Sequence, residues 1–361
     1  MKIAPSEYFA RQAALNEVGP EGVARLQAAR VTIVGVGGVG CAIAVYLAKA
    51  GVGTLRLIDQ DIVEPTNLQR LHGISETQLY LPKAEAVREA IVGLHPWVKA
   101  EAVVETLRQA NAEELLAETD IVFDGLDNFR TRYVLNRYCS TAELPYLFTS
   151  SVALQGHVGL FTPPETPCLE CALPGVQDGP ENACELLGAS SSTVGVVGAI
   201  AAEEASKFLL GLRSRVQGSI LTIDMMGPDF LLTRVTRRDN CPVCRGEVTK
   251  MPDEGVAVML CGARTANVLP KRTLLVDLKA VAQYASETVL ASSDSVLVYR
   301  LGSHIVSLFQ TGRVIVDGVR DQSEALQIAE KVWKQAERAS SPRLAGLTRG
   351  LDLLLLNSPP P

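Results

Sequence analysis

This 361-residue chain has few long apolar runs, few aromatic residues and few histidines, which argues against a membrane protein and against a metal site built from histidines. No apolar run approaches the roughly 18 residues that a membrane span needs, and the first residues, MKIAPSEYFARQ, lack the apolar core of a signal peptide. Aromatic residues make up 5%, and the 4 histidines show no metal-ligating spacing. We therefore expect a cytoplasmic protein with no membrane partner.

An excess of positive charge is also missing. The formal net charge is −6, which argues against nucleic acid as the main partner and suits small-molecule or protein substrates. A hydrophobic share of 47% beside 20% charged residues is ordinary for a soluble α/β protein. Disulfides are not expected in a reducing compartment, so the 8 cysteines point to metal binding or catalysis.

The chain is organised around residues 30–61. An apolar, β-branched run at 31–34 predicts a buried parallel strand, and a G-x-G-x-x-G turn and a helix to about residue 50 follow it. Glycines permit the tight turn and the close approach of a phosphate, which the helix N-terminus attracts. A second strand at 54–58 ends at an acid placed to bind a ribose. The residues assigned to this nucleotide site are Gly35, Gly37, Gly38, Gly40 and Asp59.

Further strands and helices alternate along the chain, which predicts a Rossmann-like, doubly wound α/β sheet. We expect a nucleotide-binding domain at 1–250 with a crossover loop at about 174–193, a small α+β domain at 251–338 and a disordered tail at 339–361. The expected helices include 6–14, 21–29, 82–94, 110–118, 130–142, 193–210, 278–289 and 321–337. Strands are expected near 98–104, 121–125, 146–151, 157–163, 219–226, 230–237, 256–260, 296–301, 304–309 and 313–317.

Two C-x-x-C pairs predict a structural zinc site with four thiolate ligands, Cys168, Cys171, Cys241 and Cys244. The alternative is two unrelated thiol pairs. A redox C-x-x-C normally begins a helix, and we expect neither pair to do so. The closed ligand set favours a structural role over a catalytic one.

In chain order, the motifs are the glycine turn, Asp59-x-Asp61, Asn67-Leu68-Gln69-Arg70, Pro82-Lys83, Asp127-Asn128 and the two cysteine pairs. Together they resemble the motifs of the ThiF/MoeB/HesA family, prokaryotic members of the ubiquitin-activating-enzyme superfamily. The resemblance covers residues 7 to about 250, and the small unit after it resembles an extension that some members carry. It implies that residues 1–250 form an adenylation domain, which uses Mg-ATP to adenylate the C-terminal Gly-Gly of a ubiquitin-like protein.

Attack of a carboxylate on the α-phosphate builds up negative charge, so the site needs cations rather than a base. Arg70 and Lys83 are therefore assigned to the phosphates and Asp127 to magnesium. The remaining members of the predicted nucleotide site are Asp61, Asn67 and Asn128. The alternatives without a catalytic role are that Lys83 is a solvated lysine at the start of a helix and that Asp127 caps the following helix.

Arg11 matches an arginine that in the family reaches the ATP of the opposite subunit, which implies a homodimer. The family often has a second arginine where Tyr8 stands, so this chain departs from the pattern there.

Cys184 lies in the Gly/Pro-rich crossover and matches the active cysteine of members that have one. The predicted function is therefore activation of a ubiquitin-like modifier, with a thioester on Cys184 and transfer to a conjugating enzyme. The alternative is sulfur-carrier activation, in which a sulfur donor converts the adenylate to a thiocarboxylate and Cys184 can be inert. Cys41 and Cys139 are expected to be buried, and Cys261 is the next candidate acceptor. An NAD-dependent oxidoreductase or a non-catalytic scaffold leaves Arg70, Lys83 and Asp127 unexplained.

Overall fold

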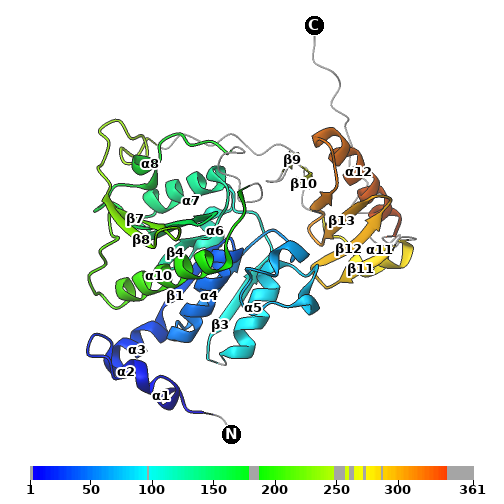
Figure 1. Ribbon diagram of the computed structural model, residues 1–361. Helices are drawn as coiled ribbons and strands as arrows, with labels where there is room; N and C mark the ends of the chain where they lie inside the picture. The colour runs from blue at the N-terminus through cyan, green and yellow to red at the C-terminus, as the bar shows by residue number, and fades with distance from the viewer. Residues whose placement is uncertain are drawn as a thin grey trace. The chain divides into compact units, whose positions relative to one another are not determined.

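The chain folds into two compact units, Met1–Asp253 and Glu254–Pro361. A computed structural model describes residues 3–95, 97–178, 187–247, 257–259, 264–270, 274–285 and 288–339 (Figure 1). Cys184, Cys261 and the expected tail from residue 340 onward lie outside the described residues. Among the described helices, none combines the length and the apolar character needed to cross a membrane.

An eight-stranded sheet forms the first unit, in the order β3-β2-β1-β4-β5-β6-β7-β8. The first five strands in this order, β3, β2, β1, β4 and β5, are parallel, which confirms the Rossmann-like core. The remaining strands, β6, β7 and β8, each pair antiparallel with the strand before them. The strands are β1 (Arg30–Val34), β2 (Thr54–Ile58), β3 (Lys99–Val103), β4 (Ile121–Asp124), β5 (Tyr146–Val152), β6 (Gln155–Phe161), β7 (Ser219–Asp224) and β8 (Asp229–Arg234).

Helices cover both faces of this sheet, as a doubly wound fold requires. On one face α4 and α10 lie side by side and share a core with α3 and α5 (Figure 1). On the other face α6 and α7 contribute Leu116 and Leu135 to a second core. The helices are α1 (Pro5–Tyr8), α2 (Ala10–Ala13), α3 (Gly19–Ala28), α4 (Gly38–Ala50), α5 (Lys83–Leu94), α6 (Ala112–Leu116), α7 (Phe129–Thr141), α8 (Leu169–Ala172) and α10 (Ser191–Leu209). Two 3₁₀ turns, η1 (Pro65–Asn67) and η2 (Glu76–Gln78), precede α5.

The second unit has its own core. Its antiparallel sheet has the order β11-β12-β13-β14-β10-β9, and α11 and α12 pack their apolar side chains on one face of it. The elements are β9 (Ala257–Met259), β10 (Thr265–Val268), α11 (Leu278–Tyr284), β11 (Val289–Ser292), β12 (Val296–Leu301), β13 (His304–Phe309), β14 (Val314–Asp317) and α12 (Gln322–Ala339).

Three expectations about secondary structure were wrong. The helix expected at 6–14 breaks at Phe9, whose buried ring packs against Gly51. The helix expected at 278–289 ends at Tyr284, and Val289–Ser292 pair with β12 as strand β11. Cys168 does begin a short helix, α8, because Leu169 is buried and donates its N–H to Asn136 (2.9 Å).

Candidate functional site

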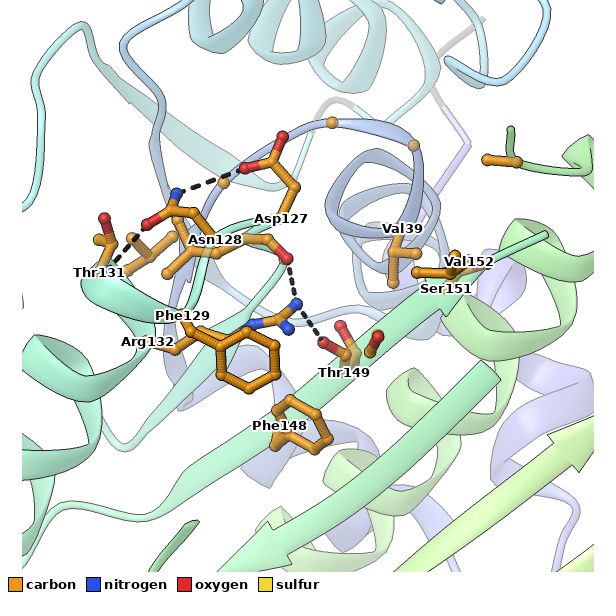
Figure 2. Close-up of a pocket in the computed structure, with 18 of the residues that line it drawn as sticks. Val39, Asp127, Asn128, Phe129, Thr131, Arg132, Phe148, Thr149, Ser151 and Val152 are labelled. Carbon is orange, nitrogen blue, oxygen red and sulfur yellow. Dashed lines mark hydrogen bonds between the residues drawn. The ribbon is translucent and has the colours of Figure 1, made fainter. Parts of the chain in front are cut away.

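A pocket of about 530 Å³ opens at the carboxyl ends of the central parallel strands (Figure 2). In open α/β sheets this edge is where ligands bind. Of the residues assigned to the nucleotide from sequence, nine line the pocket: Gly35, Gly37, Gly38, Asp59, Asp61, Arg70, Lys83, Asp127 and Asn128. Gly40, Asn67 and Arg11 do not line it.

The glycine turn allows backbone segments to pack more closely than side chains permit. Gly35 has a φ of +85°, and a Cβ there would lie 2.7 Å from the carbonyl oxygen of Gly125. A Cβ on Gly40 would lie 1.9 Å from the carbonyl oxygen of Gly35, so Gly40 supports the turn from behind. Helix α4 begins directly after Gly37, which has no side chain to cap it. The first N–H groups of α4 are therefore available to an anion at the pocket.

Asp59, which is buried, and the partly buried Asp61 and Lys83 form a charge cluster at the end of β2. The Asp59 oxygens accept hydrogen bonds from the N–H groups of Val36 and Asp61, each at 2.8 Å. Lys83 Nζ lies 3.1 Å from Asp61 Oδ2, whereas Asp61 Oδ1 is buried with no hydrogen-bond partner in the described part of the chain. A buried acceptor without a partner fits a site that a ligand completes.

Charge and burial act against each other in this cluster. Burial raises the pKa of Asp59 to about 6, although Lys83 partly offsets it. Burial alone would lower the pKa of Lys83, but the carboxylates of Asp61 and Asp59 raise it above its ordinary value. Lys83 therefore remains a cation at the pocket at neutral pH.

Arg70 reaches the pocket from the η1 turn. Its Nη1 donates to the carbonyl oxygen of Thr66 (2.8 Å), and its side-chain carbons pack against Gly38. Asn67 is buried and accepts the N–H of Glu64 (3.3 Å) within the capping box of η1. Its position supports the turn that carries Arg70 rather than the pocket itself.

Asp127 and Asn128 follow β4 in the loop that leads to α7. Asn128 caps α7 by accepting the N–H of Thr131 (2.9 Å), and its Nδ2 donates to Asp127 Oδ1 (3.3 Å). Asp127 itself is exposed at the pocket. The helix-cap role considered for Asp127 therefore falls to Asn128.

Sequence reasoning missed part of the pocket wall. Arg132, Phe148, Thr149, Ser151 and His157 also line it. Burial and then the Arg132 charge lower the pKa of His157. The sequence does offer one signal, because Arg132 falls among the apolar residues on one face of a predicted helix. Its partners could not be identified, because they lie on strands that only the fold brings close.

Arg11 is exposed on α2 and does not line the pocket of its own chain. Its helix is anchored by neighbours: Phe9 is buried, and the Tyr8 hydroxyl lies 2.8 Å from Nδ1 of His95. Gln12 Nε2 donates to the carbonyl oxygen of Ala50 (2.9 Å). These contacts hold the segment that presents Arg11 outward.

The four paired cysteines come together. All four Sγ atoms lie within 4.8 Å of one another, and the pairs Cys168–Cys241 and Cys171–Cys244 are each 3.6 Å apart. Thiolates at about 2.3 Å from a tetrahedral zinc ion lie roughly 3.7 Å apart, so the cluster could hold such an ion. The N–H of Arg238 donates to Cys171 Sγ (3.5 Å), a contact that favours a thiolate.

Two further cysteines are buried as expected. Burial raises the pKa of the Cys41 thiol to about 12, and it raises that of Cys139 as well. Both thiols are therefore unreactive at neutral pH.

Comparisons with known proteins agree with the fold and the motifs. The profile of the ThiF family matches residues 9–243. The SAMP-activating enzyme of Haloferax volcanii is 36% identical over 247 residues, covering 68% of this chain and 91% of that protein. The sulfur carrier protein adenylyltransferase of Thermus thermophilus is 35% identical over 248 residues, covering 67% of this chain and 92% of that protein.

Among solved structures, Escherichia coli MccB superposes with a TM-score of 0.59 at 22% identity, over 70% of this chain and 76% of that chain. This likeness concerns the fold. The match to the ThiF family profile lies within the first unit. The protein therefore belongs to the ThiF family.

Proposed function

We propose that this chain uses Mg-ATP to adenylate the C-terminal carboxylate of a small sulfur-carrier protein of the ubiquitin-like type that ends in Gly-Gly. The observation that supports this most directly is the convergence of Arg70, Lys83 and Asp127 on one pocket beside the glycine turn. Two cations and a carboxylate beside a glycine turn that can bind a phosphate suit a reaction at phosphorus better than hydride transfer.

The proposed reaction is a displacement at phosphorus. An oxygen of the carrier carboxylate bonds to the α-phosphorus, the bond from that phosphorus to the bridging oxygen breaks, and pyrophosphate leaves. Lys83, kept protonated by Asp61 and Asp59, and Arg70 would stabilise the charge that develops on the phosphates. A carboxylate is already ionised at neutral pH, so this step needs no general base.

The pocket offers ligands of the kind that magnesium prefers, since carboxylate oxygens are hard donors. The exposed carboxylate of Asp127 fits this role, and the unpartnered Oδ1 of Asp61 is a further acceptor nearby in the same lining. When bound, magnesium would neutralise phosphate charge. Asp127 is the residue we propose to hold it, and the cysteine cluster is the site we propose for zinc.

The relatives favour a sulfur carrier over a conjugated modifier as the substrate, because the Thermus thermophilus relative is named for a sulfur carrier protein. Activation of a modifier through a Cys184 thioester, with a conjugating partner, remains the second candidate. One observation favours it: the described residues on either side of Cys184, Asp178 and Leu187, both lie at the pocket. Asp178 accepts the N–H groups of Phe129 (2.5 Å) and Arg130 (3.2 Å), and Leu187 lines the pocket.

The test combines the chain with ATP, magnesium and each small Gly-Gly-ended protein from the same source. We expect carrier-dependent ATP–pyrophosphate exchange and a carrier that gains the mass of AMP. No exchange with any such protein would overturn the proposal. An adduct that thiol removes and that Cys184→Ala abolishes identifies Cys184 as the acceptor. The mass of the adduct then separates the two candidates, because a thioester contains only the sulfur of Cys184 at the junction, whereas an acyl disulfide formed in sulfur transfer contains one sulfur more.

A further inference from the structure

A buried ion pair lies beneath the pocket, between α7 and the end of β4. Arg132 is 4% exposed and Asp124 is 0% exposed, and Nε of Arg132 lies 3.3 Å from the Asp124 carboxylate. The Tyr146 hydroxyl donates to Asp124 Oδ2 at 2.5 Å. Burying two charges costs desolvation free energy, and apolar side chains of similar size often stabilise a fold equally well. Stability alone therefore does not account for this pair.

The pair holds the loop that carries Asp127. Asp124 Oδ1 accepts the N–H of Leu126 (3.0 Å), and Arg132 Nη2 donates to the carbonyl oxygen of Leu126. That carbonyl belongs to the peptide joining Leu126 to Asp127. Both peptide groups of Leu126 are therefore fixed by the two charged side chains, and with them the direction in which Asp127 leaves the sheet.

The guanidinium of Arg132 is itself fixed in orientation. Its Nη2 also donates to the carbonyl oxygen of Thr149 on β5 (3.0 Å), as Figure 2 shows. The rings of Phe129 and Phe148 each have their centroid 5.1 Å from the guanidinium carbon. A planar group with several donors meets these acceptors at once, whereas the single ammonium of lysine cannot.

We propose that Arg132, through its pairing with Asp124, is a positioning residue that sets the Asp127 carboxylate for magnesium. The proposal rests on the proposed function, in which Asp127 holds that ion. In this role Arg132 acts through the Leu126 peptide and needs no contact of its own with the metal. Its contribution is to keep one peptide bond, and the carboxylate beyond it, in a single orientation.

The test compares ATP binding with and without magnesium by calorimetry, together with ATP–pyrophosphate exchange, for four chains besides the wild type. These are Asp127→Ala, Arg132→Lys, the double variant Asp124→Asn with Arg132→Met, and a control, Arg137→Met with Glu170→Gln. The double variant removes both charges and leaves none unpaired, so we expect it to remain folded by thermal unfolding. The control removes another α7 ion pair (2.8 Å) that does not line the pocket.

In the wild type, magnesium should increase the affinity for ATP. We expect this increase to be roughly 10- to 100-fold smaller in the double variant and in Arg132→Lys, because removing the partners that orient a metal ligand weakens metal binding by such factors. Because Arg132 also lines the pocket, the comparison uses the ratio of the ATP affinities with and without magnesium in each chain, and the control should give the wild-type ratio. A folded double variant that keeps the full magnesium gain would overturn the positioning role. If Asp127→Ala keeps that gain, the magnesium assignment fails instead, and with it the premise of the proposal.

Discussion

Asp127 is the residue on which the proposed chemistry depends most, because it is an exposed carboxylate in the same pocket lining as Arg70 and Lys83. We expect Asp127→Ala to remain folded and to lose carrier-dependent ATP–pyrophosphate exchange by at least about a hundredfold, since the metal loses its protein ligand. Glu113→Ala, which removes an exposed carboxylate of α6, is the matched control. Near-normal exchange in folded Asp127→Ala would rule out the assigned role.

Asp59 makes the stability of the first unit depend on pH. Its pKa rises from 3.8 in the unfolded chain to about 6 in the folded one. The folded state therefore binds more protons than the unfolded state between these values, and stability falls as pH increases through this window. Above about pH 6 the loss is complete.

Asp59→Asn removes the carboxyl group that titrates. It also removes hydrogen bonds, but that loss changes the free energy of unfolding by an amount that does not vary with pH. We expect the stability of Asp59→Asn relative to the wild type to increase from pH 3.8 to about 6 and then to level off. Urea unfolding at a series of pH values measures the difference. A difference that is flat across the window would show that the buried carboxyl keeps its ordinary pKa.

At the scale of elements, the cysteine cluster connects α8 to the segment after β8. We expect one zinc ion per chain, and Cys241→Ser should lower the melting temperature more than it changes ATP affinity, because the cluster lies outside the pocket lining. Cys139→Ser, at a buried cysteine of α7 outside the cluster, should keep its zinc. Metal analysis that finds no zinc in chelator-free protein would contradict the assignment.

The sequence predicted correctly those elements whose structure depends on residues close together in the chain. The turn from β1 into α4 depends on glycines within a few residues of each other, and its position was predicted well. Strand β11 was missed because it forms only by pairing with β12, and residues 289–292 show no preference strong enough to reveal that. Likewise α8 depends on the contact between Leu169 and Asn136.

The same distinction holds for the candidate site. Asp59, Lys83 and Asp127 follow predicted strands or begin a predicted helix, so their meeting at one sheet edge could be expected. The pairing of Arg132 with Asp124 and Thr149 could not, because it needs the positions of α7, β4 and β5 together. Asn67 was assigned to the nucleotide on resemblance alone, and the fold gives it hydrogen bonds within its own turn.

At the scale of the whole molecule, the predicted homodimer, in which each site receives Arg11 from the partner, requires Arg11 to be exposed outside the pocket of its own chain, and Arg11 has that position. Mixing two inactive variants, Arg11→Ala and Asp127→Ala, should then restore exchange in heterodimers at one of the two sites. Up to about a quarter of wild-type activity is expected from random pairing of equal amounts.

Each variant mixed only with itself is the control for that experiment. Mass-tagged chains can establish that subunits have exchanged. If exchanged mixtures stay inactive, Arg11 acts within its own chain or has no role in the reaction.

The close packing of Gly35 and Gly40 with Gly125 also sets when the pocket comes into existence during synthesis. Gly125 follows β4, which pairs with β1 only after the intervening β2, α5 and β3 have been made. A nascent chain that stops before β4 contains the whole glycine motif but lacks the backbone against which it closes. Pairing of strands this distant in sequence is slow, because loop-closure entropy is lost before the contacts form. ATP bound as proposed would therefore stabilise only chains in which β4 has already paired with β1, and would act on folding after that step.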